Sequence, residues 1–479
     1  MQSYILLALP LSLALFAFSL SRPWTLRQFL ASREPSVEFQ KLNSTPFECL
    51  DRESKDTRED GIGFIPEYAG WNFEPTASKI SVATTTSADL NVLLPWIFYH
   101  RLLGVEIFYI FVEGELQLPE NHFILKSIPG VKVNSPTNKL REKQIKSVVW
   151  KGDWLSNYQY KPCNHQLYIR QTFNLEAATS VAKRAGMKWI LHLSVDELIV
   201  PGGVIRNSLA SALHSYNEAV DLVVFPIYES VLENDKVREP FTETGNFYSI
   251  SWRTTAPRYF LGEADGCIAA RLQTGLHPSG PQRWSSTHKA LKNTAADEAV
   301  VLHYTYTRFA DLLSMRFLCP DCQPEPKLAR RCFFNEFDSM AFTAAKTLAN
   351  KELMKWYRDH LVWGNKTLVT ELVQRSILVR NHIPQIVIQG LREVGFFQET
   401  TETGKQAFED SLTTERLQMK EMVRRGQKAG KLKFEMASLN FSKGSRMEKT
   451  ESSRPRQTKL LPKDHVEIKH EKWFSINQQ

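Results

Sequence analysis

The chain has 479 residues, of which 42% are hydrophobic, 23% charged and 11% aromatic. This apolar share excludes a wholly disordered protein, and 22 Gly with 23 Pro exclude a collagen-like or low-complexity chain. The formal net charge is +8, but residues 401–479 carry +6 of it and residues 1–400 only +2. Most of the positive charge therefore lies in the C-terminal tail. No zinc-finger spacing or aromatic RNA-binding stretch accompanies it, so no nucleic-acid partner is expected.

The first 21 residues predict a membrane anchor or signal segment. Residues 2–21 contain no charged side chain, and twenty helical residues span about 30 Å, the thickness of the hydrocarbon core of a bilayer. An uncleaved anchor is favoured over a cleaved signal because no small-x-small cleavage site precedes Arg22. Orientation is open, since the basic residues that follow the segment argue against a lumenal body by the positive-inside rule.

Two other features favour a lumenal or extracellular body. Asn43, Asn365 and Asn440 begin tripeptides that fit the N-glycosylation pattern. Cys319, Cys322 and Cys332 lie close together in the sequence. A disulfide within this cysteine group is favoured over free thiols or a zinc site, because no partnering pair at finger spacing is present.

The predicted elements begin at residue 79 and alternate between strand and helix. Strands are expected over residues 79–86, 106–112, 131–134, 189–193 and 222–225, and helices over residues 90–103 and 164–185. The first helix should be broken by, or begin near, Pro95. Further helices are expected over residues 333–349, 352–360 and 368–377. The alternation is typical of a parallel α/β sheet followed by a helical region.

Polar residues at two strand ends are candidates for chemistry, because ligands bind at the carboxyl ends of parallel strands. Thr84, Thr85 and Thr86 end the first strand, where a hydroxyl-rich loop suits a nucleotide or simply caps the next helix. Asp196 and Glu197 follow an apolar strand, where they could hold Mg²⁺ or Mn²⁺ or simply mark the exit of the strand.

Ordered sequence blocks resemble a known family. The blocks are KISVATTT (79–86), LPWIFYHRLLGVEIFYIFVEG (94–114), NHQLYIRQTFNLE (164–176), WILHLSVDELIVP (189–201), VVFPIYES (223–230), REPFTE (238–243), AARLQTGLHPSGPQRW (269–284), AVVLHYTYTRF (299–309) and VIQGLRE (387–393). Over roughly residues 79–395, the chain resembles GT-A glycosyltransferases and, more narrowly, the plant KOBITO-type glycosyltransferase-like proteins.

The resemblance implies a GT-A-like nucleotide-diphospho-sugar transferase fold with a mostly parallel sheet, in a single-pass type II membrane protein. The implied organisation is an anchor or signal segment (1–21), a stem (22–78), a catalytic domain (79–335), a helical extension packed on it (336–398) and a basic, disordered tail (399–479). The implied location is the endomembrane system, the Golgi in the first place, with the plasma membrane as an alternative.

The resemblance also implies site residues. The family's Asp-x-Asp motif falls on Ser194-Val195-Asp196, so Ser194 replaces the first acid. The implied metal ligands are Asp196, Glu197 and His303, and the implied donor-binding residues are Thr84, Thr85, Thr86, Glu113, Arg170, Asn174 and Ser194. One of Glu229, Glu263 and Asp265 is expected to act as the base.

The expected function is metal-assisted transfer of a sugar, with Mn²⁺ or Mg²⁺, from a nucleotide sugar such as a UDP-sugar to a glycan or cell-wall polysaccharide. An inverting single displacement is expected from kinship with family-2-like enzymes. The alternative is a catalytically silent GT-A scaffold that supports cellulose or wall synthesis and cell elongation, because Ser194 supplies no charge at the first acid position.

Overall fold

The computed structural model describes residues 79–145, 164–201, 209–249, 267–280, 282–296, 299–320, 322–333, 336–375 and 377–428. Several predictions lie outside these residues: the membrane segment, the stem, two of the candidate bases (Glu263 and Asp265) and the tail beyond residue 428. Within the described part of the chain, no helix is both long enough and apolar enough to span a bilayer.

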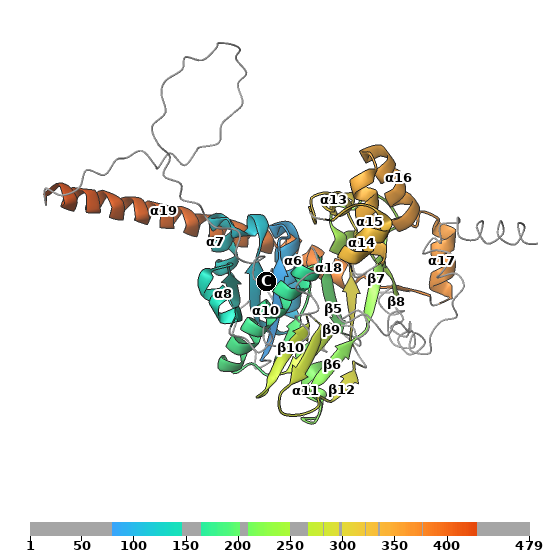
Figure 1. Ribbon diagram of the computed structural model, residues 1–479, viewed down its shortest axis with the longest axis horizontal. Helices are drawn as coiled ribbons and strands as arrows, with labels where there is room; N and C mark the ends of the chain where they lie inside the picture. Colours follow the sequence, from blue (N-terminus) through green and yellow to red (C-terminus); the bar gives the residue numbers. More distant parts are fainter. Residues whose placement is uncertain are drawn as a thin grey trace, which may run out of the picture. The chain divides into compact units, whose positions relative to one another are not determined.

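The larger of the two main sheets has seven strands (Figure 1). In spatial order its strands are β12 (Asn293–Ala295), β6 (Leu222–Phe225), β9 (Cys267–Arg271), β4 (Trp189–His192), β1 (Ile80–Thr86), β2 (Val105–Val112) and β3 (Val131–Asn134). The predicted strands are confirmed. The sheet is mixed, because β9 runs antiparallel to both β4 and β6 while the other neighbours are parallel.

The second main sheet has five strands, and the sequence did not predict it. Its order is β14 (Leu378–Arg380), β8 (Asn246–Ser249), β7 (Ile227–Val231), β13 (Ala299–His303) and β5 (Glu197–Pro201). Only β13 and β7 are parallel; the other pairs are antiparallel. A separate hairpin is made by β10 (Leu276–Gly280) and β11 (Arg283–Ser286). The fold is therefore α/β with mixed sheets.

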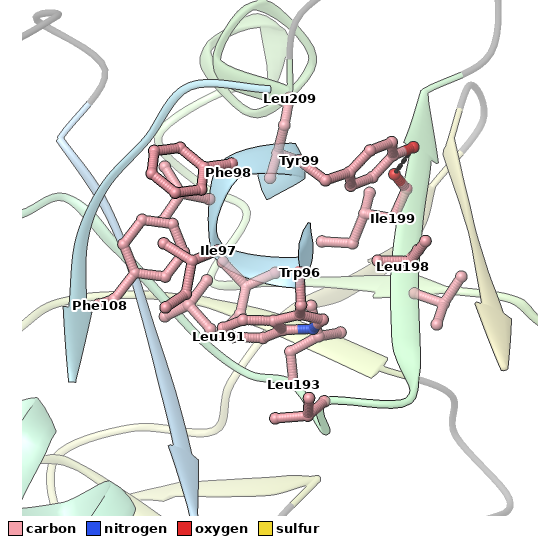
Figure 2. Close-up of a cluster of buried hydrophobic side chains, with 14 of the residues drawn as sticks. Trp96, Ile97, Phe98, Tyr99, Phe108, Leu191, Leu193, Leu198, Ile199 and Leu209 are labelled. Carbon is pink, nitrogen blue, oxygen red and sulfur yellow. Dashed lines mark hydrogen bonds between the residues drawn. The ribbon is translucent and has the colours of Figure 1, made fainter. Parts of the chain in front are cut away.

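Helix α6 (Leu90–Leu102) connects the two sheets through buried hydrogen bonds. The Nε1 of Trp96 donates to the Glu197 carbonyl (2.9 Å), and the Tyr99 hydroxyl donates to the Ile199 carbonyl (2.9 Å). The Ile199 amide donates to His100 Nε2 (3.2 Å), and His100 Nδ1 bonds the Trp96 carbonyl (2.8 Å). Figure 2 shows Trp96 and Tyr99 reaching from this helix toward β5, surrounded by apolar side chains.

The expectation of a break at Pro95 was wrong, because α6 runs through this residue. The helix begins at Leu90, where the Asp89 carboxylate accepts the Val92 amide as an N-cap (3.2 Å). A proline in a helix interior removes one backbone hydrogen bond. Burial of every side chain from Leu93 to His100 in the main core offsets that loss.

Helices complete the body on both sides of the sheets. Helix α10 (Asn164–Arg184) covers the face of the seven-stranded sheet opposite α6, with Leu175, Ala178 and Ala182 in its core. The shorter helices are η1 (Gly114–Gln117), α7 (Pro119–Ser127), α8 (Asn138–Ile145), α11 (Leu209–Ser215), α12 (Pro240–Glu243) and α13 (Phe309–Ser314).

Helices between residues 326 and 361 share an apolar core that includes Phe342, Leu353 and Tyr357, and we call the part from residue 326 to residue 393 the helical extension. Its helices are α14 (Pro326–Cys332), α15 (Glu336–Thr347), α16 (Asn350–Leu361), α17 (Lys366–Gln374) and α18 (Ile383–Glu393). Helices α13 to α16 are grouped together in Figure 1. A disulfide joins Cys322, just before α14, to Cys332 at the end of this helix. The disulfide predicted within the cysteine group is confirmed.

The last described helix, α19, runs from Phe396 to Lys428. Its first turn packs Phe396 and Phe397 against Phe98 of α6. The helix therefore includes residues 399–428, which the sequence had assigned to a disordered tail. Glu and Lys or Arg side chains are frequent in this segment, and such residues favour a solvated helix as readily as a coil. By contacts the chain divides into two units, residues 1–414 and 415–479.

Candidate active site

Carboxylates and one histidine converge on the five-stranded sheet, from the start of β5, the middle of β7 and the end of β13. We call Asp196, Glu197, Glu229, His303 and Thr305 the acid–histidine cluster. His303, the last residue of β13, pairs with Glu197 on β5 and with Glu229 on β7. Its Nδ1 lies 2.5 Å from Glu229 Oε1, and its Nε2 lies 3.4 Å from Asp196 Oδ2. The sequence predicted these four charged or titratable residues, and the structure places them together.

The carboxylates determine the protonation of His303. Burial lowers the pKa of His303, but the charges of Glu229 and Asp196 raise it more, so that its pKa lies well above the usual value. For Asp196, removal from water raises the pKa and the charge of His303 lowers it, with a net shift downward. Asp196 keeps half of its side chain exposed, so it is the member of the cluster that is open to a ligand.

Glu197 has a different environment from Asp196. Its side chain is buried (5% exposed), and its Oε2 accepts the Ser194 backbone amide at 2.7 Å. Burial is the main reason that the pKa of Glu197 rises to about 7. The carboxylate therefore closes the turn between β4 and β5, and it is not directed outward as a metal ligand would be.

The predicted metal set is consequently only partly assembled. Within the described residues, no group of three or more His, Cys, Asp or Glu side chains is arranged to hold a metal ion. Asp196 and the Nε2 of His303 remain as two adjacent donors. Magnesium and manganese are commonly held by one or two carboxylates when substrate phosphates supply the other oxygens. A two-residue set fits an ion that arrives with a diphosphate.

A second group of polar contacts lies at the ends of β1 and β2, and we call it the β1–β2 edge group. Asn174 Nδ2 donates to Thr85 Oγ1 (3.0 Å). Arg170 forms a two-pronged ion pair with Glu113, with Nε–Oε1 and Nη2–Oε2 distances of 2.8 and 3.3 Å. Four predicted donor-binding residues are thus brought together by α10, and Thr86 joins them through its carbonyl, which accepts the Glu113 amide.

The side chains of Thr86 and Thr84 are engaged in, or buried within, the end of β1. Thr86 Oγ1 accepts the Ala88 amide and shapes the turn before α6. The Thr84 side chain is buried (2% exposed) in the strand interior, and its hydroxyl has no hydrogen-bond partner among the described residues.

The two groups are connected through the segment that follows β4 (Trp189–His192). Strands β1 and β4 are parallel neighbours with Ala83 opposite His192, and the Leu193 amide donates to the Ala83 carbonyl. In this register Ser194, the second residue after β4, comes level with Thr85, which is still paired with Phe111 of β2. Ser194 is two residues before Asp196 in the sequence, so the backbone after β4 connects the two groups.

Sequence reasoning missed two residues near His303. Thr305 donates its hydroxyl to Glu229 Oε2 (3.0 Å). Tyr306 has a positive φ of 49°, uncommon for a non-glycine residue, and its hydroxyl donates to Asp338 Oδ1 (2.7 Å) on α15. Both lie in the quoted block AVVLHYTYTRF. No local pattern marks either one, because their partners are distant in the sequence.

The fold and the site define a class: an α/β protein with an acid–histidine cluster beside a hydroxyl-rich strand end. No model of a known protein family matches the chain. Two Arabidopsis thaliana proteins are similar to it. "Glycosyltransferase-like At3g57200" is 42% identical over 350 residues, which cover 70% of this chain and 68% of the relative. "Glycosyltransferase-like At2g41451" is 42% identical over 333 residues, which cover 67% and 74%. The chain belongs to this family of plant glycosyltransferase-like proteins.

Proposed function

We propose that the chain is a membrane-anchored glycosyltransferase of GT-A type, close to the KOBITO-type proteins, that moves a sugar from a nucleotide sugar to a glycan or wall polysaccharide. One observation carries the proposal: the His303 ring lies between the carboxylates of Asp196 and Glu229. The names of the two relatives support the same activity.

In this proposal the two groups of the site divide the donor between them. The edge group takes the nucleoside, since Thr85, Asn174 and Glu113 offer hydroxyl, amide and carboxylate groups to a base and a ribose. Asp196 and His303 hold Mn²⁺ or Mg²⁺ next to the diphosphate. When bound, the ion offsets the charge that develops on the departing diphosphate. The donor is a UDP-sugar and the displacement inverts the anomeric centre.

The location follows from the same proposal. The disulfide between Cys322 and Cys332 supports folding in an oxidising compartment. Asn365, the N-cap of α17, is exposed and accepts the Leu368 amide through Oδ1, which leaves its Nδ2 available for a glycan. We therefore place the body in the lumen of the endomembrane system, in the Golgi, with the plasma membrane as the alternative. Removal of glycans by an endoglycosidase should increase the gel mobility of the protein purified from plant cells.

Calorimetry tests the activity most directly. UDP should bind the purified protein more tightly with Mn²⁺ than without it, and a panel of nucleotide sugars should identify one hydrolysed or transferred donor. An absence of any metal-linked binding of UDP or UDP-sugars would rule out the proposal. Anomeric NMR of the product tests the inverting course.

A silent scaffold for wall synthesis is the second candidate. Two observations favour it: Ser194 replaces an acid, and no three-ligand metal group exists among the described residues. In this case the protein would bind partners of the wall-forming machinery without turning over a donor.

A further inference from the structure

Both oxygens of the Glu229 carboxylate are engaged by neighbouring side chains. Oε1 lies 2.5 Å from His303 Nδ1, and Oε2 accepts the hydroxyl of Thr305 at 3.0 Å. Only 15% of the Glu229 side chain is exposed, compared with 50% for Asp196. Glu229 therefore faces His303 and Thr305 more than it faces solvent.

The backbone fixes this arrangement. Strands β7 and β13 are parallel neighbours, and Glu229 is paired with His303 in their register. The other flank of β13 pairs with β5, so His303 cannot shift along the strand without breaking two sets of backbone bonds. The imidazole thus has Nδ1 against Glu229 and Nε2 toward Asp196, and the Thr305 hydroxyl lies 2.9 and 3.1 Å from these two nitrogens.

A carboxylate that accepts the Nδ1–H of a histidine fixes both the tautomer and the direction of the ring. In metal sites this outer partner orients the ligating nitrogen and raises its basicity. We propose that Glu229 is a positioning residue, which holds His303 with Nε2 directed at the donor diphosphate and its ion. This inference rests on the proposed function, and it removes Glu229 from the three candidate bases.

The geometry argues against Glu229 as the base. A base must accept a proton from the acceptor hydroxyl at hydrogen-bond distance. Each Glu229 oxygen already accepts a hydrogen bond from a neighbouring side chain, and only 15% of the side chain is exposed, which leaves little room for an acceptor hydroxyl. The base is then Glu263, Asp265 or another group, and Glu229 acts only through His303.

The first test reads the ring itself and needs no activity. Heteronuclear NMR of the ring nitrogens of histidine-labelled protein, recorded on the alkaline side of the His303 titration, should show the Nδ1–H tautomer. A His303→Asn variant identifies the signal. Because Thr305 Oγ1 lies 2.9 Å from Nδ1 and could replace the carboxylate, the comparison is made in Thr305→Val protein. In this background Glu229→Ala should lose the tautomer, whereas Glu229→Gln should retain it, because the amide oxygen still accepts from Nδ1. A wild-type ring protonated on Nε2 would overturn the proposal.

The second test separates positioning from base catalysis. Glu229→Ala should weaken Mn²⁺-linked UDP binding by about 10- to 100-fold, with UDP binding in EDTA unchanged, and Glu229→Gln should recover most of that loss. A base would behave otherwise: both variants would lose kcat to a similar extent with metal-linked binding intact. Glu218→Ala is the matched control, because Glu218 is an exposed carboxylate just before β6.

The outcomes distinguish this inference from the proposed function. If wild-type protein binds no nucleotide but shows the Nδ1–H tautomer that Glu229→Ala abolishes in the Thr305→Val background, the proposed activity fails and Glu229 still orients His303. If nucleotide binding is metal-linked and Glu229→Ala leaves it unchanged, the activity stands and the positioning role is excluded.

Discussion

Asn174 Nδ2 donates a hydrogen bond to Thr85 Oγ1, across 89 positions of sequence, and so ties α10 to the end of β1. The same Asn174 accepts from Gln144 Nε2 at 3.0 Å, so it is satisfied on both sides although it is only 8% exposed. Removal of a buried amide leaves its former hydrogen-bond partners unsatisfied, which costs about 1–3 kcal/mol.

Asn174→Ala should therefore lower the free energy of unfolding by about 1–3 kcal/mol. It should also weaken UDP binding about tenfold if this edge holds the nucleoside, since one lost hydrogen bond corresponds to about 1.4 kcal/mol. Urea denaturation and calorimetry measure the two effects. Ser180→Ala, an exposed position on the same helix, is the control and should change neither quantity. Unchanged UDP affinity in a folded Asn174→Ala protein would show that the nucleoside binds elsewhere.

Asp196 and Ser194 decide between the enzyme and the silent scaffold. In the proposed enzyme, Asp196→Asn should reduce Mn²⁺-linked UDP affinity at least about tenfold, because it removes a charged oxygen ligand. Ser194→Asp should bring little gain if Ser194 belongs to a working site. A large gain in Mn²⁺ affinity on Ser194→Asp would instead indicate a site that has lost its ion, and would favour the scaffold.

His100 predicts a pH dependence of stability. Its ring is fully buried and neutral, since Nε2 accepts the Ile199 amide, and burial lowers the pKa of His100 to about 3. The unfolded chain takes up this proton near pH 6.5, and the folded chain does not until pH 3. The stabilisation is thus complete above pH 6.5 and is lost as the pH falls toward 3.

Between pH 6.5 and 5, His100 should contribute a fall of roughly 2 kcal/mol in the free energy of unfolding, at about 1.4 kcal/mol per pH unit. His100→Gln should reduce the slope in this range by the contribution of one proton, because glutamine keeps an acceptor but does not titrate, while the buried His192, with its pKa lowered to about 4, keeps its own contribution. Urea denaturation across the pH range measures the slope. His288→Gln, an exposed histidine after β11, should leave the slope as it is in the wild type. An equal slope in the His100 variant would show that the residue titrates normally.

The Cys322–Cys332 disulfide should stabilise the helical extension. The two residues are 10 apart in sequence, and closing a loop of this size contributes about 2–4 kcal/mol. A protein with Cys322→Ala and Cys332→Ala should unfold at lower denaturant concentration by a corresponding amount. Peptide mapping without reduction should recover the two cysteines linked in the wild type. Pairing of either cysteine with a different partner would contradict the structure.

The sequence predicted the local elements better than their partners. The predicted strands at 131–134 and 222–225 agree with β3 and β6, because each is a short run rich in apolar residues. The second sheet could not be predicted in this way. Its strands are brief, β7 follows β6 after a single proline, and their pairing depends on contacts made only in the folded chain.

The candidate site shows the same division. Asp196, Glu197 and His303 were predicted from strand ends and family resemblance, and they do converge. Their roles could not be read from the sequence. The inward turn of Glu197 depends on one backbone amide at Ser194, and the engagement of Glu229 depends on a histidine 74 residues later.

Helix α6 has a consequence for how substrates enter. It starts at Leu90, soon after the threonines of β1, and its Trp96 and Tyr99 donate hydrogen bonds to the backbone of β5, the strand that begins at Glu197. Separation of the two sheets would break these bonds and expose the apolar side chains packed around them to water, at a cost in free energy. We therefore expect the two sheets to move as one body, so that a substrate reaches the cluster without a hinge motion between them.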